Sequence, residues 1–245
     1  MGSSGTSAAA VSAWLCIAGW GRKAAVVTKP RPYYSHGGIT IYHGDSLKIV
    51  PQLDLSGVGC IVSDPPYGYG HTSGWGGKFK GREIAGDNST AGRDWFTQNM
   101  PETPSIWFGT WKVAAPPGAH TCCVWDKGPA SGMGDLSIPW KPSWELFWVI
   151  GKGWDGKRDE GVIKGCRVPT WSTGPAKRLH PTEKPVGLMA RILSKAPPGV
   201  VLDPFMGAGS TLRAAKDLGL QAIGIELERE YIDAAVDRLR QEVLL

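Results

Sequence analysis

Several features that define other classes of protein are missing from this 245-residue chain. It has only five cysteines and no Cys-x-x-Cys pair, so we expect neither a disulfide framework nor a metal site. No apolar run reaches the roughly 20 residues that a membrane helix needs, and the stretch 8–20 lacks the basic start of a secretion signal. These absences predict a cytoplasmic protein without a targeting segment.

Strong charge imbalance is also missing, because 27 Lys and Arg stand against 22 Asp and Glu, for a formal charge of +5. This balance favours polyanionic partners without requiring them. The length suits one main domain. The small, polar start predicts a poorly ordered leader over residues 1–35, with one domain over 36–245.

What is present is an alternation of short apolar runs and amphipathic stretches, which predicts an α/β fold with a doubly wound, mostly parallel sheet. The expected strands are 39–43, 58–63, 119–125, 144–150, 200–202 and 222–225. The expected helices are 95–113, 185–196, 210–218 and 229–239. Residues 69–94 read as a long loop, and residues 151–179, with seven basic and three acidic side chains, as an inserted lobe.

The run 201–211 reads as a buried strand, a glycine turn and a helix start, which is how a doubly wound sheet holds a nucleoside cofactor. Nineteen positions after Gly207, the next strand ends at Glu226, where an acid can accept ribose hydroxyls. A nicotinamide site fits less well, because Asp203 precedes the turn and the third glycine of the dinucleotide fingerprint is absent. In the plainer alternative the glycines make a tight turn and Glu226 caps a helix.

The sequence Asp64-Pro65-Pro66-Tyr67 follows a predicted strand and presents acceptors only, because two prolines remove two backbone donors. Asp64 and the Pro65 carbonyl suit the two hydrogens of an exocyclic base amine, and Tyr67 suits stacking on a base turned out of a duplex. The alternative is an ordinary rigid turn. No cysteine follows a proline, which argues against methylation of cytosine C5 through a cysteine nucleophile.

With these motifs, the chain from about 39 to 239 resembles the amino-methyltransferases of bacterial and phage DNA, in the permuted order that puts Asp-Pro-Pro-Tyr before the glycine turn. The other matching motifs are 44–47, 124–128 and 180–185. The resemblance implies a Rossmann-like methyltransferase fold with an antiparallel edge strand. It also implies S-adenosylmethionine as cofactor, double-stranded DNA as partner, and a bacterial or phage-infected cell as the setting, often within restriction-modification.

The resemblance implies roles for particular residues. Asp64, Pro65, Pro66 and Tyr67 would act on the base. The cofactor would be held by Asp45, Lys184, Asp203, Pro204, Phe205, Gly207, Gly209, Ser210, Thr211 and Glu226. Asp45 could instead cap a turn and Lys184 lie at the surface. Glu183 stands where the family commonly has glutamine, which affects how the neighbouring lysine pairs.

Basic side chains in the loop and in the lobe are candidates for contacting phosphates. They are Lys78, Lys80, Arg82, Lys152, Lys157, Arg158, Lys164 and Arg167. A solvated basic surface is the alternative. The lobe is short for target recognition, which is compatible with a homodimer.

Three functions therefore stay open. The expected one is methylation of adenine N6 in DNA at a specific site. Methylation of cytosine N4 is the first alternative, since relatives with that activity more often carry serine at the position of Asp64. The second is a catalytically inactive DNA-binding module, although neither motif is damaged. Methylation of protein glutamine or RNA is disfavoured by the motif order.

Overall fold

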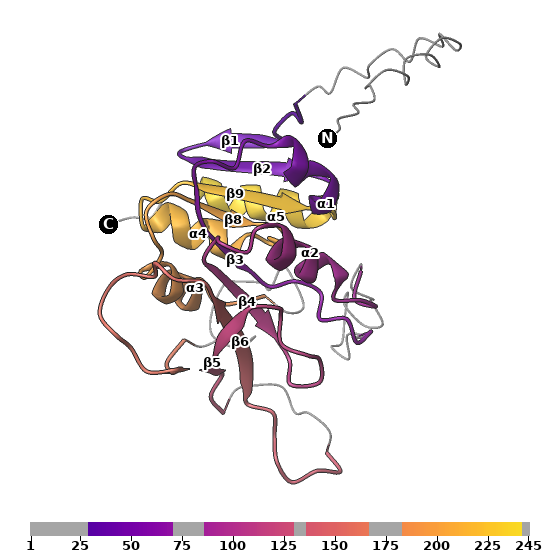
Figure 1. Cartoon of the computed structure of the whole chain (residues 1–245), viewed down its shortest axis with the longest axis vertical. Helices are drawn as coiled ribbons and strands as arrows, with labels where there is room; N and C mark the ends of the chain where they lie inside the picture. Colours follow the sequence, from indigo (N-terminus) through magenta and orange to yellow (C-terminus); the bar gives the residue numbers. More distant parts are fainter. Residues whose placement is uncertain (1–28, 71–85, 130–135, 167–182, 242–245) are drawn as a thin grey trace, which may run out of the picture.

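The computed structural model describes residues 29–70, 86–129, 136–166 and 183–241, and these residues form a single nine-stranded sheet with helices on both faces (Figure 1). The strands are β1 (Tyr34–His36), β2 (Ile39–His43), β3 (Val58–Ser63), β4 (Ser105–Gly109), β5 (Ala119–Asp126), β6 (Trp144–Ile150), β7 (Val162–Ile163), β8 (Val200–Asp203) and β9 (Ala222–Glu226). The helices are α1 (Ser46–Ile49), the 3-10 turn η1 (Val50–Gln52), α2 (Ala91–Asn99), α3 (Val186–Leu193), α4 (Ser210–Asp217) and α5 (Arg229–Arg240).

The strand order is β1-β2-β9-β8-β3-β4-β6-β5-β7. Strands β2, β9, β8, β3 and β4 run parallel, β1 pairs antiparallel at the edge, and β6 lies antiparallel between β4 and β5. The chain winds outward in opposite directions from the neighbours β8 and β3. Ligands of doubly wound sheets bind at such a reversal, beyond the carboxyl ends of the strands.

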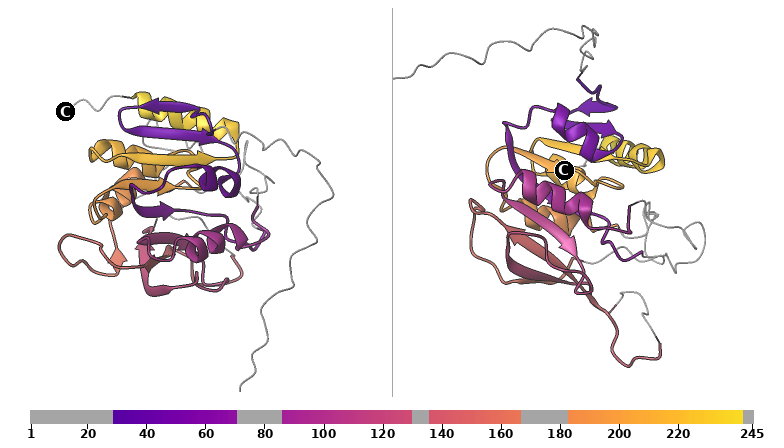
Figure 2. Two further views of the ribbon diagram at one scale, coloured as in Figure 1. Left: turned by 45° about the horizontal axis from the view of Figure 1, so that its top comes forward. Right: turned by 45° about the vertical axis from the view of Figure 1, so that its right-hand side comes forward.

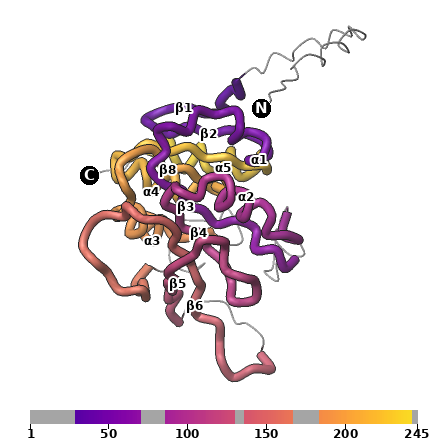
Figure 3. The backbone as a smooth tube through the Cα atoms, viewed as in Figure 1, coloured from indigo at the N-terminus to yellow at the C-terminus, as the bar shows by residue number. Residues whose placement is uncertain are grey.

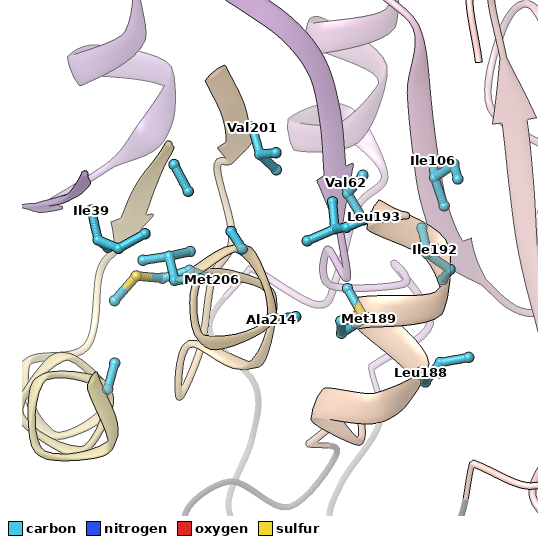
Figure 4. Packing of buried hydrophobic residues seen from close by; sticks show 14 of the residues in the cluster. Ile39, Val62, Ile106, Leu188, Met189, Ile192, Leu193, Val201, Met206 and Ala214 are labelled. Carbon is cyan, nitrogen blue, oxygen red and sulfur yellow. The ribbon is translucent and has the colours of Figure 1, made fainter. Parts of the chain in front are cut away.

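Alternating side chains divide the core into two layers. On β3, Cys60 and Val62 pack on the side of α3, α4 and α5, whereas Ile61 packs with Phe96 of α2 on the other side. Figure 4 shows the first layer, in which Leu193 of α3 lies beside Val62 of β3 and Ala214 of α4 faces Met189 of α3. Both faces of the central strands are thus covered, as expected of a parallel sheet, and Figure 2 shows the layers from two further directions.

The expected α/β fold with a mostly parallel sheet is confirmed, but the helix predicted over 95–113 is wrong in its second half. The helix α2 ends at Asn99, and residues 105–109 form the fully buried strand β4. Pro101 and Pro104 prevent the helix from continuing, and Ile106, Trp107 and Phe108 suit a strand covered on both faces. The other predicted helices and strands are present, with ends that differ by a few residues.

The expected domain limits can be compared with these elements. The strand β1 starts at Tyr34, just inside the span expected to be a leader, and pairs with β2. In the expected lobe, the described residues 151–166 include β7, which extends the sheet beside β5. Within the described ranges, no helix is long and apolar enough to span a membrane.

Candidate active site

The two main motifs meet where β3 and β8 lie side by side. The Ser63 hydroxyl, on the residue before Asp64, donates a hydrogen bond of 2.5 Å to the carboxylate of Asp203, which begins the glycine turn. The distant motifs are therefore adjacent at the carboxyl end of the parallel strands, at the point where the winding direction reverses.

The glycine turn joins β8 to α4 and is anchored on β9. The Met206 amide donates to the Ile225 carbonyl at 3.1 Å, and the Gly207 amide donates to Glu226 Oε2 at 2.9 Å. Gly209 has a φ of +76°, and an added Cβ would lie 2.8 Å from the Cβ of Ala235. Only glycine satisfies both the left-handed backbone and the close approach of α5.

Glu226 accepts two backbone amides, from Gly207 through Oε2 and from Glu228 through Oε1 at 2.8 Å. The second bond precedes α5, whose N-cap is Glu228, so Glu226 is not the helix cap that the plainer alternative expected. Each carboxylate oxygen has a further lone pair, so the two bonds orient the group without exhausting it. Burial raises the pKa of Glu226, although the backbone amides partly oppose this effect.

Asp203 is 2% exposed and works as a brace inside the turn. It accepts from Ser63 and from the Phe205 amide at 3.2 Å, and Thr211 also bonds its carboxylate. Burial raises its pKa to about 6 despite these hydrogen bonds. A cation bound nearby would therefore favour the charged form of this carboxylate and lower its pKa.

The remaining cofactor candidates occupy the same edge. Asp45 caps α1 by accepting the Leu47 amide at 3.0 Å, as the plainer alternative expected, and the preceding Gly44 amide bonds the Glu226 carbonyl at 2.8 Å. The Phe205 ring packs edge-on against Phe96 at 5.8 Å, beside Pro204. The Glu226 carboxylate, the Phe205 ring and the buried Asp203 carboxylate are groups that would suit a cationic nucleoside such as S-adenosylmethionine.

A basic side chain from α5 holds the turn from behind. Arg238 donates to the Ala208 carbonyl and to the Ser210 hydroxyl, each at 3.0 Å, and forms an ion pair with Glu183. The acid that departs from the family pattern at Glu183 therefore pairs with this arginine. In this way α5 connects the glycine turn to the segment that carries Lys184.

Lys184 lies at the acceptor motif. Its side chain is 4% exposed, and its ammonium lies 2.5 Å from Asp64 Oδ2 and 2.7 Å from Glu145 Oε1. Tyr67 donates its hydroxyl to Asp64 Oδ1 at 2.8 Å and lies within hydrogen-bond reach of Glu145 as well. These contacts place the Lys184 ammonium between Asp64 and Glu145, and its contact with the cofactor stays a prediction.

Glu145, which sequence analysis missed, is the residue that completes this cluster. It is the second residue of β6, after the exposed Trp144, and its other oxygen pairs with Lys127 at 2.7 Å. Burial opposes ionisation of Glu145, but the two lysines lower its pKa to about 2. Burial raises the pKa of Asp64, only partly offset by Lys184. In the sequence, the only sign of this role is that Glu145 is an acidic residue next to Trp144, at the start of a predicted strand.

The predicted DNA contacts are divided between two ends of the sheet. Lys152, Lys157 and Arg158 are exposed on the connection after Ile150, which lies beside Ser105 at the amino end of β4, opposite the end that carries Asp64. Figure 3 shows this connection on the side of α3, away from α1 and α2. The structure thus does not bring these three residues to the site.

Other basic candidates differ in position. Lys164 is exposed just after β7. That strand pairs with the carboxyl-terminal part of β5, at the same edge of the sheet as Asp64, which we call the catalytic edge. The candidates Lys78, Lys80, Arg82 and Arg167 lie outside the described residues. Among the residues that are described, no cluster of three His, Cys, Asp or Glu side chains is suited to a metal ion.

Known proteins resemble the chain in sequence and in fold. It is 25% identical to the Type II methyltransferase M.ScaI of Streptomyces caespitosus over 86% of this chain and 84% of that protein. It is 49% identical to the Type II methyltransferase M.HinfI of Haemophilus influenzae over 67 residues, which are 26% of this chain and 19% of that protein.

Two solved structures share the fold. The M1.HpyAVI–SAM complex has a TM-score of 0.59 at 24% identity, covering 83% of this chain and 100% of that one. The cytosine-N4-specific PvuII DNA methyltransferase has a TM-score of 0.63 at 15% identity, covering 88% and 91%. The DNA methylase family model of the N6/N4 type matches residues 87–237, more than half of the 245 residues. The chain therefore belongs to the N6/N4 DNA methylases, whose methyl donor is S-adenosylmethionine.

Proposed function

We propose that this protein methylates the N6 amine of adenine at a specific site in double-stranded DNA. The observation that carries the proposal is the hydrogen bond from Ser63 to Asp203, because it joins the acceptor motif to the cofactor turn. The Type II names of the relatives support a role in restriction-modification. A homodimer stays a prediction.

The acceptor residues are suited to a weakly nucleophilic amine. The Asp64 carboxylate, 22% exposed, keeps lone pairs beyond those used by Lys184 and Tyr67, so it can accept one amine hydrogen while the Pro65 carbonyl accepts the other. The rings of Tyr67 and Tyr69 are stacked at 6.4 Å and offer an aromatic surface beside this position. Holding nitrogen and methyl carbon in line is the main catalytic contribution expected of the protein.

When bound, S-adenosylmethionine supplies a methyl group on a positively charged sulfur. The bound cofactor would supply its methyl carbon to the amine nitrogen and keep the electron pair of the carbon–sulfur bond on sulfur, while Asp64 and the Pro65 carbonyl hold the amine. The nitrogen then loses one proton. Asp64 is placed to receive it, because burial raises its pKa above that of an exposed aspartate.

Methylation of cytosine N4 is the second candidate, supported by the shared fold of the PvuII enzyme, which is specific for that amine. The two reactions use the same acceptor geometry, so the substrate base must be identified directly. The aspartate in the acceptor motif favours adenine.

The test is to incubate the full chain with S-adenosylmethionine and unmodified DNA of varied sequence, and to analyse the nucleosides by mass spectrometry. We expect N6-methyladenine. N4-methylcytosine as the sole product would overturn the choice of base, and the absence of any modified nucleoside would favour a DNA-binding module.

A matched variant separates catalysis from binding. Asp64→Ala should abolish methyl transfer while S-adenosylmethionine still binds, because the cofactor contacts expected of Glu226 and the glycine turn are untouched. Calorimetry with the cofactor gives the control. Turnover by Asp64→Ala at the wild-type rate would contradict the role of this carboxylate.

A further inference from the structure

Behind the acceptor motif lies a partly buried cluster of two carboxylates and two ammonium groups. Asp64 and Glu145 share Lys184, and Glu145 also pairs with Lys127. The exposed fractions of these side chains are 22% for Asp64, 13% for Glu145, 4% for Lys184 and 27% for Lys127. Opposite charges thus balance within the cluster, as burial requires.

The geometry makes Asp64 and Glu145 competitors for the same donors. Lys184 lies 2.5 Å from Asp64 and 2.7 Å from Glu145, and its ammonium also donates to the Tyr67 hydroxyl at 3.3 Å. The Tyr67 hydroxyl has one proton and lies within reach of both carboxylates. A stronger hydrogen bond from Lys184 or Tyr67 to Glu145 therefore means a weaker one to Asp64.

We propose that Glu145 is a positioning residue of the methyl-transfer site, which fixes Lys184 and Tyr67 and keeps Asp64 from being fully neutralised by the lysine. The inference rests on the proposed function, in which Asp64 accepts the amine hydrogen. Glu145 need not touch the base or the cofactor. It acts through Lys184 and Tyr67, and Lys127 holds it in place.

Four ionisable side chains, three of them charged and one a neutral phenol, face Asp64 from different elements. Lys184 precedes α3, Glu145 is the second residue of β6, Tyr67 follows β3, and Asp203 ends β8. The pKa of Asp203 is raised in part by Asp64. The charge on Lys184 lowers the pKa of Asp64 and the charge on Glu145 raises it. Removing the Glu145 charge therefore shifts ionisation of Asp64 to lower pH, whereas removing Lys127 shifts it to higher pH.

The experiment compares Glu145→Gln and Lys127→Gln in the full chain, with Asp159→Asn as a control for loss of a paired carboxylate at the opposite end of the sheet. We measure kcat and its pH profile, the KM for DNA, and the Kd for S-adenosylmethionine. For Glu145→Gln we expect kcat to fall by at least about tenfold, the scale of a charged hydrogen bond, with the cofactor Kd changed by less than about twofold.

The acidic limb of the pH profile distinguishes positioning from a merely structural role. It should move to lower pH in Glu145→Gln, to higher pH in Lys127→Gln, and not at all in Asp159→Asn. If Glu145→Gln does not fold, the shift of the acidic limb in Lys127→Gln is sufficient to test the inference. The inference would be overturned if the acidic limb stayed at the wild-type pH in the folded variants. It would also be overturned if kcat and the affinity for the cofactor fell in parallel. A wild-type chain that methylates no DNA would contradict the proposed function as well.

Discussion

Asp203 shows how one side chain can serve both folding and chemistry. Its carboxylate braces the glycine turn through Ser63 and the Phe205 amide, yet it is almost fully buried. Burial raises its pKa to about 6, because desolvation disfavours the charged form. A cation bound beside the turn would offset that penalty, which couples cofactor affinity to the charge of this group.

We expect the affinity for S-adenosylmethionine to fall as pH drops through about 6, because protonation removes the Asp203 charge that favours a cation. Asp203→Asn should weaken binding near neutral pH and flatten this dependence, leaving a shallower contribution from Glu226, whose pKa is also raised. Calorimetry at a series of pH values measures both effects. A Kd that stays constant with pH in the wild type would contradict this coupling.

At the scale of elements, the turn between β8 and α4 depends on the close approach of α5. Gly209 combines a left-handed backbone with contact to Ala235. We expect Gly209→Ala to lower the free energy of unfolding by roughly 1–3 kcal/mol, through backbone strain and overpacking, and to weaken cofactor binding. Thermal denaturation and calorimetry measure the two effects.

Gly187 is the matched control for that substitution. It is exposed in α3, and an added Cβ would meet nothing within 4 Å. Gly187→Ala should stabilise the chain by about 0.5–1 kcal/mol, because alanine restricts the unfolded backbone and favours a helix. Equal losses of stability in the two variants would show that strain at the turn is not the cause.

Another element-scale connection runs through Arg238 of α5, which holds the Ala208 carbonyl, Ser210 and Glu183. Arg238→Met should lower the free energy of unfolding by roughly 2–4 kcal/mol, because it leaves partly buried acceptors and a carboxylate without their donor. Glu183→Gln keeps an acceptor oxygen and should cost less than about 1 kcal/mol. Urea denaturation compares the two, and a larger loss for Glu183→Gln would contradict this ranking.

At the scale of the whole molecule, the two ends of the sheet have different roles. The carboxyl ends of β3, β8 and β9 carry the acceptor and cofactor motifs, whereas Lys152 and Lys157 lie beyond the opposite end. The double variant Lys152→Gln with Lys157→Gln should leave the KM for DNA within about twofold, since distant exposed charges are screened by salt. Lys164→Gln should raise the KM for DNA more, because Lys164 lies nearer the edge of the sheet that carries Asp64. Steady-state methylation kinetics test the order, and a reversed order would place DNA at the amino end.

The sequence by itself determined the motifs, the α/β fold and most strands, because the residues concerned are consecutive and carry local signals. Strands 58–63 and 144–150 have the predicted bounds. Asp64, directly after β3, was identified from the Asp-Pro-Pro-Tyr motif, and Glu226, at the end of β9, from its spacing to the glycine turn. The prediction of a helix over 95–113 was wrong in its second half. An apolar run that is buried on both faces shows neither the helical nor the strand period of hydrophobic residues, so the sequence does not distinguish the two.

Only the tertiary structure decided which groups meet. Lys184 and Glu145 converge on Asp64 from segments far apart in the chain, and the antiparallel insertion of β6 places Glu145 at the catalytic edge. The same reversal of direction carries Lys152 to the opposite end. Local spacing encodes which elements form, whereas the order and direction of strands in the sheet set the distances between charges, and these distances control the chemistry.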